Sequence, residues 1–348
     1  MINIFAGAVG LGLIWAIVTL GIFISYRVLN MPDLSVEGSI VTGAAVAAML
    51  IVAGVHPVLA LGGSALAGAG AGLITGFLHT KLKIPALLSG ILTMTALYSV
   101  NLRIMDGRPN VALLQTDTIL TPFTDAGLTR DPAIILIGII TIMIVISIQR
   151  WFLTTEFGCA LRATGNNPHM STAQGINTDT MKLVGLACAN SLVGLAGGLL
   201  AQYQGFVDIQ MGVGAIVIGL ASLIIGEVIF GRTSLLRNMI AVVLGAVVYR
   251  CIIALVLEAG MAATDLRMFT AITVAIALWL PTARAQIDAI SKRVRSSRDA
   301  GFDDIGDGKT AIQRTWLGGF IEGASPGRDN PGRSSRKRDS QKRRGGDS

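Results

Sequence analysis

The chain has 348 residues, of which 52% are hydrophobic and 14% charged, and its mean hydropathy is +0.65. Soluble domains are about a quarter charged, so this composition excludes an ordinary soluble protein. Several continuous apolar runs reach the ~20 residues that a helix needs to cross a bilayer, and their continuity excludes the alternating strands of a membrane β-barrel. The 42 glycines are typical of closely packed membrane helices.

The predicted fold is all-α, a polytopic transmembrane helical bundle with about nine spans, within a range of eight to ten. The expected spans are 3–24, 39–55, 58–78, 84–101, 132–149, 183–203, 212–230, 236–257 and 268–282. The Gly-rich segment 212–230 also fits a broken or re-entrant helix. The first span lacks a preceding basic region, which favours a retained anchor over a cleaved signal.

Lys and Arg placement predicts the orientation. With the loop 154–182 in the cytoplasm, eight basic residues fall in inside loops and four in outside loops, so we expect the N-terminus outside and the C-terminus inside. The inside set is Arg27, Lys81, Lys83, Arg150, Arg162, Lys182, Arg232 and Arg237, and the outside set is Arg103, Arg108, Arg130 and Arg267.

Two regions are expected: a transmembrane domain at 1–283 and a basic, largely disordered cytoplasmic tail at 284–348. The tail holds 15 Lys/Arg against 9 Asp/Glu, whereas the first 283 residues hold 13 against 12. The basic balance is therefore mostly a property of the tail, and we expect no nucleic-acid partner.

The polar loop 154–182 interrupts an otherwise apolar sequence and is rich in helix start and stop signals. A short helix is predicted from Glu156 to Thr164, with Gly165 as a left-handed C-cap. In the turn that follows, Asn167 is the expected N-cap and Pro168 the first helical residue.

A second short helix is expected after that turn, ending at Gly175, and Asn177 or Thr178 should cap the next span. A loop built in this way is a rigid docking element for something outside the membrane.

The segment 31–39, with the sequence MPDLSVEGS, places two carboxylates and two hydroxyls at the start of a span. One interpretation is a helix N-terminus capped by Ser35. The other is a helix break that lines a solute path. The candidate pathway-lining residues, chosen for polarity within or beside spans, are Asp33, Ser35, Glu37, Ser39, Thr93, Thr95, Asn190 and Gln202.

Two charges fall within spans, Glu227 and Arg250, and a charge inside a membrane is costly unless it is paired or hydrated. Their opposite depths disfavour a mutual pair. A structural role is favoured for each, and Arg250 is expected to extend toward the outer face.

The sequence provides no catalytic apparatus and no metal-ligand cluster. Residues 306–310, GDGKT, resemble the end of a phosphate-binding loop, but Asp303 stands where the pattern needs glycine. The energy for any transport must therefore come from a partner or an ion gradient. An ion-coupled secondary transporter remains the alternative, although Glu227 is its one deep carboxylate.

The segment FGCALRATGNNPHMSTAQGINTDTMK resembles the cytoplasmic loop of ATP-binding-cassette (ABC) importer permeases of the branched-chain amino acid and ribose type. The loop in that family has the form FGxALRAxGxNxxxAxxxGIxxxxxK. The matching positions are Phe157, Gly158, Ala160, Leu161, Arg162, Ala163, Gly165, Asn167, Ala173, Gly175, Ile176 and Lys182. The segment PDLSVEGS is similar to the DLSVGS region, and most similar to permeases of tryptophan/tyrosine type or uncharacterised substrate.

The likeness covers about residues 1–283, but Thr75 replaces a family asparagine, so a substrate cannot be carried over. The resemblance implies a multi-pass plasma-membrane permease for a small solute, with no cofactor of its own and ATP-Mg on a partner. The implied partners are a cytoplasmic ATPase dimer, a second permease copy or paralogue, an extracytoplasmic solute-binding protein and the lipid bilayer. The implied ATPase-coupling residues are Gly158, Ala160, Arg162, Gly165, Asn166, Asn167, Pro168, Ala173 and Gly175.

Overall fold

The computed structural model describes residues 2–113, 116–125, 127, 129–231 and 234–258, together with 268, 272, 275 and 279. All of these residues belong to one unit, Met1–Ala283. The expected tail, and nearly all of the expected ninth span, lie outside the described residues.

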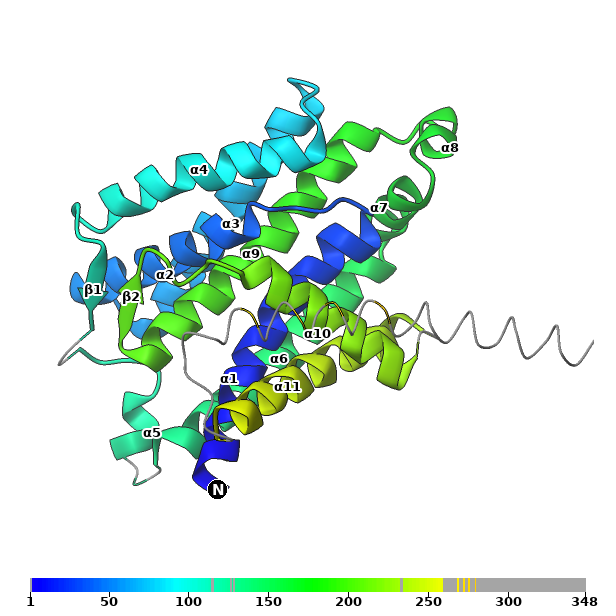
Figure 1. Ribbon diagram of the computed structural model, residues 1–348. Helices are drawn as coiled ribbons and strands as arrows, with labels where there is room; N and C mark the ends of the chain where they lie inside the picture. Colours follow the sequence, from blue (N-terminus) through cyan, green and yellow to red (C-terminus); the bar gives the residue numbers. More distant parts are fainter. Residues whose placement is uncertain are drawn as a thin grey trace, which may run out of the picture. The chain divides into compact units, whose positions relative to one another are not determined.

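Eight of the predicted apolar runs form helices (Figure 1). They are α1 (Ile2–Ile22), α2 (Val36–Val52), α3 (Pro57–Thr80), α4 (Ala86–Ile104), α6 (Arg130–Thr154), α9 (Thr178–Gln204), α10 (Ala215–Phe230) and α11 (Leu235–Glu258). In the described part of the chain, six helices are long and apolar enough to cross a membrane, while α2 and α10 are shorter. The prediction of a helical, polytopic membrane protein is confirmed.

Short helices and one π-helix connect these elements. The π-helix η1 (Phe23–Val28) continues α1, α5 (Thr121–Asp125) precedes α6, and α7 (Glu156–Asn166) and α8 (Pro168–Ala173) lie between α6 and α9. A π-helix widens the backbone by one residue per turn and is uncommon outside functional positions.

Local sequence signals set several helix ends. Pro57 starts α3, where its missing N–H is not needed, and His56 Nδ1 accepts a hydrogen bond from the Val58 N–H at 3.3 Å. Gly205 ends α9 with φ +77°, and Gly214 precedes α10 with φ +82°. Both conformations are left-handed and favour glycine.

Helix α9 packs against α2 and α3 through closely spaced glycines. A Cβ added to Gly43 of α2 or to Gly68 of α3 would collide with the backbone of α9 near Gly194. Gly72 and Gly76 of α3 also lie against the α9 backbone. Small residues bring these backbones into direct contact.

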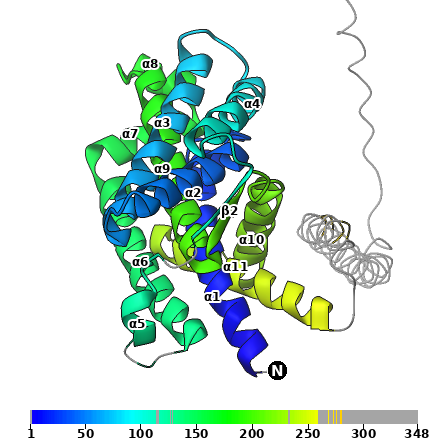
Figure 2. The same ribbon diagram turned by 90° about the vertical axis from the view of Figure 1, so that its left-hand side faces the viewer.

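A second group of helices is formed by α1, α6, α10 and α11 (Figure 2). Gly226 of α10 lies against the carbonyl of Ala241, and Gly245 of α11 lies against that of Ser222. The two helices are therefore packed backbone to backbone in the same way as α3 and α9.

A two-stranded antiparallel sheet, which the all-α prediction did not include, joins the segments after α4 and α9. Strand β1 (Asn110–Ala112) pairs with β2 (Phe206–Asp208), and Val111 lies opposite Val207. The pairing fixes the start of the chain segment that leads from β2 to α10.

Candidate functional site

The loop between α6 and α9 is built as two short helices, as predicted. Thr155 is the N-cap of α7, and its hydroxyl accepts from the Gly158 N–H at 3.2 Å. Gly158 is buried, and a Cβ there would collide with the Phe152 carbonyl and with Leu153. This glycine therefore lets α7 fold back directly onto the end of α6.

The left-handed C-cap predicted at Gly165 is wrong. Helix α7 continues through this position to Asn166, and Gly165 is not among the described glycines with positive φ. A Cβ on Gly165 would instead collide with the carbonyl of Val28 and with Leu29. Glycine is needed here because α7 touches the backbone at the end of η1.

The start of α8 is as predicted, with Pro168 as its first residue. The Asn167 side-chain oxygen accepts from the Met170 N–H at 3.1 Å. Gly175 follows the helix with φ +83°. Asn177 caps α9 by accepting from the Thr180 N–H at 3.1 Å.

Most of the predicted coupling residues lie on the surface of this loop. Gly158 is buried, Ala160 and Gly165 are half-buried, and the exposed ones are Arg162, Asn166, Asn167, Pro168, Ala173 and Gly175. The sequence analysis missed Met170, whose side chain is 58% exposed. An exposed methionine on a helix offers a flexible apolar contact to a partner. Its position beside the capped turn could have indicated this residue from the sequence.

Three of the predicted pathway residues form one buried polar cluster, which we call the Asp33 cluster: Asp33, Ser35 and Asn190. Asp33 Oδ1 accepts from the Ser35 N–H at 2.9 Å and from the Ser35 hydroxyl at 2.6 Å. Asn190 Nδ2 donates to Asp33 Oδ2 at 2.7 Å. The expected cap by the Ser35 side chain is wrong, because that hydroxyl donates to Asp33 instead.

The Asp33 cluster lies between the non-helical segment before α2 and the middle of α9. Gly90 of α4 approaches it, since a Cβ there would meet Leu34 N at 2.8 Å and Asp33 Oδ1 at 3.3 Å. Asp33, Ser35 and Asn190 are between 0% and 3% exposed. In this conformation the cluster holds the segment before α2 against α9.

Glu37 and Ser39 extend this polar region along α2. Glu37 is half-buried, and its Oε1 accepts from the Gly214 N–H at 3.1 Å, at the start of α10. The Ser39 hydroxyl is buried and has no hydrogen-bond partner among the described residues. Nearby, Asn101 Nδ2 donates to the Gly38 carbonyl at 3.2 Å.

The remaining predicted pathway residues are apart from these contacts. Thr93 is buried and donates to Ser89 O at 3.0 Å, while Thr95 is exposed and donates to Ile91 O at 2.9 Å. Both bonds stay within α4. Gln202 lies farther along α9.

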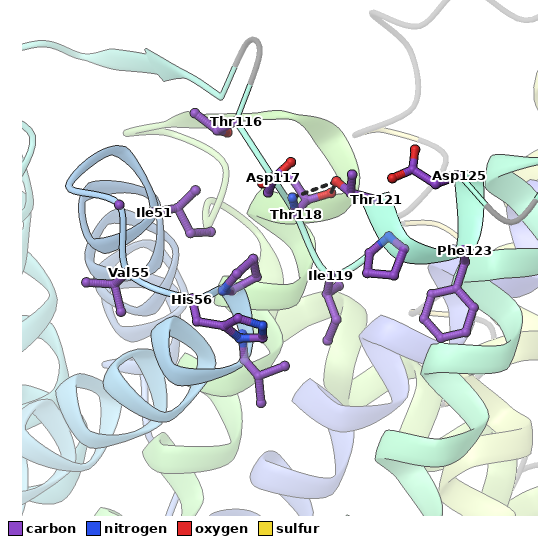
Figure 3. Close-up of a pocket in the computed structure, with 14 residues that line it drawn as sticks. Ile51, Val55, His56, Thr116, Asp117, Thr118, Ile119, Thr121, Phe123 and Asp125 are labelled. Carbon is purple, nitrogen blue, oxygen red and sulfur yellow. Dashed lines mark hydrogen bonds between the residues drawn. The ribbon is translucent and has the colours of Figure 1, made fainter.

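A cavity of about 700 Å³ lies between two walls, and Gln202 is hydrogen-bonded to one residue of each wall. Figure 3 shows the residues that line this cavity. Gln202 Oε1 accepts from the Ile119 N–H at 2.9 Å, and its Nε2 donates to Pro57 O at 3.3 Å. One wall is the turn from Ile51 to Val58, and the other is the segment 116–125. Gln202 therefore has a structural role at the end of the bundle that contains α5.

The two intramembrane charges have separate environments. Arg27 of η1 pairs with Glu227 near the end of α10, a partner that the sequence analysis did not identify. The guanidinium carbon of Arg250 lies 4.5 Å from the centre of the Trp15 ring.

The three cysteines are free thiols, and no group of three His, Cys, Asp or Glu in the described part could hold a metal ion.

Apolar helices long enough to cross a membrane, a loop of two capped short helices and buried polar groups between helices are features of a multi-pass membrane permease. The chain matches the family described as branched-chain amino acid transport system / permease component over residues 4–279, and it belongs to that family.

Curated relatives agree. The chain is 38% identical over 262 residues to a tyrosine transport system permease protein of Clostridioides difficile (strain R20291), covering 75% of this chain and 86% of the relative. It is 34% identical over 280 residues to an uncharacterised protein of Rickettsia prowazekii (strain Madrid E), covering 79% and 97%.

A more distant relative is the autoinducer 2 import system permease protein LsrC of Yersinia enterocolitica, 29% identical over 184 residues, covering 52% of this chain and 48% of the relative. No solved structure matches the chain. The resemblance found in the sequence is confirmed: the chain is a permease subunit of an ABC importer and a multi-pass protein of the plasma membrane.

Proposed function

We propose that this permease imports an amino acid or a related small solute, and that a cytoplasmic pair of ATPase subunits drives it through α7 and α8. The observation that carries the proposal is the direct contact between α7 and the membrane helices. Gly158 and Gly165 place α7 in backbone contact with the ends of α6 and η1, so a movement of the loop is transmitted directly to the bundle.

The proposed assembly has two permease subunits, either two copies of this chain or a copy and a paralogue. An extracytoplasmic solute-binding protein delivers the solute, and ATP-Mg binds to the ATPase subunits. The proposed topology has nine spans, with 268–282 as the ninth, the N-terminus outside and the basic tail 284–348 inside.

Tyrosine is the first solute to test, since one relative is named for its transport. Within the proposed pathway, the Asp33 cluster and Glu37 are the groups at the break before α2. Polar groups at interrupted membrane helices commonly face the transported solute.

The test is affinity purification of the tagged permease from its native membrane, followed by identification of bound ATPase and by uptake of labelled L-tyrosine. Met170→Asp places a charge on the exposed tip of α8 and should abolish ATPase capture. Val58→Asp makes the same change at another exposed apolar position, 54% exposed, and should leave capture intact.

Equal capture by Met170→Asp and the wild type would contradict a docking role for α8. If no ATPase is captured and uptake stops when the ion gradient is collapsed while ATP remains, the ion-coupled alternative replaces the proposal.

A further inference from the structure

Arg250 is a cationic residue of the apolar helix α11. Its guanidinium carbon lies 4.5 Å from the centre of the Trp15 ring on α1. The two helices are in close contact there, because a Cβ on Gly12 would meet Arg250 Cβ at 3.4 Å. Stacking on the indole fixes the plane of the guanidinium and leaves N–H donors at its edge.

The donors of Arg250 are not fully used by the protein. Its Nε is buried and has no hydrogen-bond partner among the described residues. The ion pairs found in that part of the chain are Arg27–Glu227 and Lys83–Asp179, and neither involves Arg250. A cation–π contact is worth about 0.5–2 kcal/mol, which is less than the cost of an arginine within a span. Among the described residues, Arg250 therefore has no ion-pair partner.

A cavity of about 380 Å³ adjoins the guanidinium, and residues of α1, α11 and the end of α9 line it. Its polar lining consists of Arg250, Asp208, Gln204 and Gln210, and Trp15 and Leu200 contribute apolar surface. Sites for small molecules typically have volumes of about 300–1,000 Å³ and combine an apolar lining with a few polar groups.

The carboxylate of this cavity is fixed in place. Asp208 is the last residue of β2, opposite Asn110 of β1, and its Oδ1 accepts from the Gln210 N–H at 2.8 Å. The chain from β2 to the start of α10 is not helical. Such backbone is tolerated at membrane depth where it is buried or lines a hydrated cavity.

We propose that this cavity binds a zwitterionic α-amino acid, with the carboxylate on the edge of the Arg250 guanidinium and the ammonium group on Asp208. The planar guanidinium donates two parallel hydrogen bonds to a carboxylate, which a lysine cannot do. The amides of Gln204 and Gln210 provide donors and acceptors for either group. This proposal rests on the proposed function, since it names the substrate class of that permease.

A second cavity of about 430 Å³ also borders Arg250, and its other polar side chains are Tyr203 and Glu258. It lacks the two amides, so we place the solute in the first cavity. A lipid phosphate is the competing anion for the same guanidinium, and the experiment below separates the two.

The test is direct binding to the purified permease in nanodiscs, read from the fluorescence of Trp15. Trp151, Trp279 and Trp316 are first replaced by Phe, so that the signal comes from the cavity. The probes are L-tyrosine, tyramine, which lacks the carboxylate, and 3-(4-hydroxyphenyl)propionate, which lacks the ammonium group. L-Tyrosine should bind at least tenfold more tightly than either analogue.

Variants of the two charged residues should affect different analogues. Arg250→Gln should weaken L-tyrosine at least tenfold and leave tyramine unchanged, and Arg250→Lys should restore binding only in part. Asp208→Asn should weaken L-tyrosine and tyramine but leave the propionate unchanged. Arg103→Gln, which removes an exposed charge, should change none of the three affinities.

Equal affinity for L-tyrosine and tyramine in the wild type would overturn the proposal. Unchanged binding of L-tyrosine to Arg250→Gln would also overturn it. The same holds if Arg250→Gln loses a co-purified phospholipid but still binds L-tyrosine normally. ATPase capture is measured on the same samples: normal capture with no amino-acid binding rejects this site and leaves the proposed function standing, whereas absent capture rejects the proposed function first.

Discussion

Arg27 and Glu227 form a two-pronged ion pair although 200 positions of sequence separate them. Arg27 Nε lies 2.7 Å from Glu227 Oε1, and Arg27 Nη2 lies 2.7 Å from Oε2. The pair ties η1 to the end of α10. Val28, the next residue after Arg27, is the one whose carbonyl lies against Gly165 of α7. Helix α7 and the ion pair therefore meet at adjacent residues of one π-helix.

Neutralising either partner should destabilise the protein to different extents. Arg27→Gln leaves Glu227 charged with its side chain 6% exposed, whereas Glu227→Gln leaves Arg27 with 31% exposure and access to solvent. Breaking a buried pair costs about 3–5 kcal/mol, and we expect Arg27→Gln near that range and Glu227→Gln about 1–2 kcal/mol. Thermal unfolding in detergent, followed with a thiol-reactive dye, measures both.

The double variant Arg27→Gln/Glu227→Gln should recover part of the loss, because both charges of the pair are then removed. Arg103→Gln serves as the control for loss of a surface charge. If Glu227→Gln folds normally and alone abolishes uptake, Glu227 carries a coupling ion rather than a structural contact.

Gly165→Ala should disrupt coupling because its methyl group would collide with the Val28 carbonyl. The backbone there cannot move without shifting η1, so we expect loss of at least 2 kcal/mol of stability and a strong drop in ATP-driven uptake. Uptake into proteoliposomes that contain the complete transporter is the measurement. Gly70→Ala is the matched control, since that helical position faces open space and alanine favours the helix by up to about 1 kcal/mol.

The α8 cap should be required for ATPase binding rather than for folding. Asn167→Ala removes the bond to the Met170 N–H and should weaken α8 by about 1 kcal/mol, because one helix donor loses its partner. Asn167→Asp keeps the acceptor. We expect reduced ATPase capture with alanine, near-normal capture with aspartate, and unchanged melting of both; identical capture by the two variants would contradict a role for the cap.

The Asp33 cluster should be sensitive to loss of its amide. Asn190→Leu preserves volume but removes the donor to Asp33 Oδ2, which then lies buried without that partner. We expect a loss of about 1–3 kcal/mol and defective uptake, measured by melting and by transport. Thr95→Ala, which removes an exposed hydroxyl bonded within α4, should leave both unchanged. A transport defect in Thr95→Ala with normal melting would support the prediction that Thr95 lines the pathway.

The orientation can be tested with a native thiol. Cys159 is exposed on α7, while Cys188 and Cys251 are partly buried. A membrane-impermeant maleimide should therefore label inverted vesicles and not intact cells, and Cys159→Ser should remove the label. Labelling of intact cells at Cys159 would place α7 outside and reverse the proposed topology.

The helices were predictable from sequence because each one corresponds to a continuous run of apolar residues, which is a local feature of the chain. The capped start of α8 at Asn167 and Pro168 and the cap of α9 at Asn177 were equally local, and the structure confirms them. The left-handed C-cap predicted at Gly165 from the local pattern was wrong. A glycine after a short helix normally signals a C-cap, whereas its cause here is contact with η1, which no local pattern records.

The polar contacts were harder to predict for the same reason. Asp33, Ser35 and Asn190 were each predicted from their polarity within or beside a span, but the bond between Asp33 and Asn190 joins elements far apart in the chain. Arg27 was counted only as a loop charge, so its pairing with Glu227 was missed. The β1–β2 pairing is also long-range, and three-residue strands have no sequence signal of their own.

The glycine contacts restrict how this protein can move. Where Gly43, Gly68 and Gly194 bring three backbones together, no side chain lies between them to change rotamer and permit sliding. The helices α2, α3 and α9 must then turn as one rigid body, and α10 with α11 as another. Among the described segments, the non-helical stretches from Leu29 to Ser35 and from Ile209 to Gly214 connect the two groups of helices, and motion there can change access across the membrane. The transport cycle of this permease would thus be a hinge motion between two preassembled blocks.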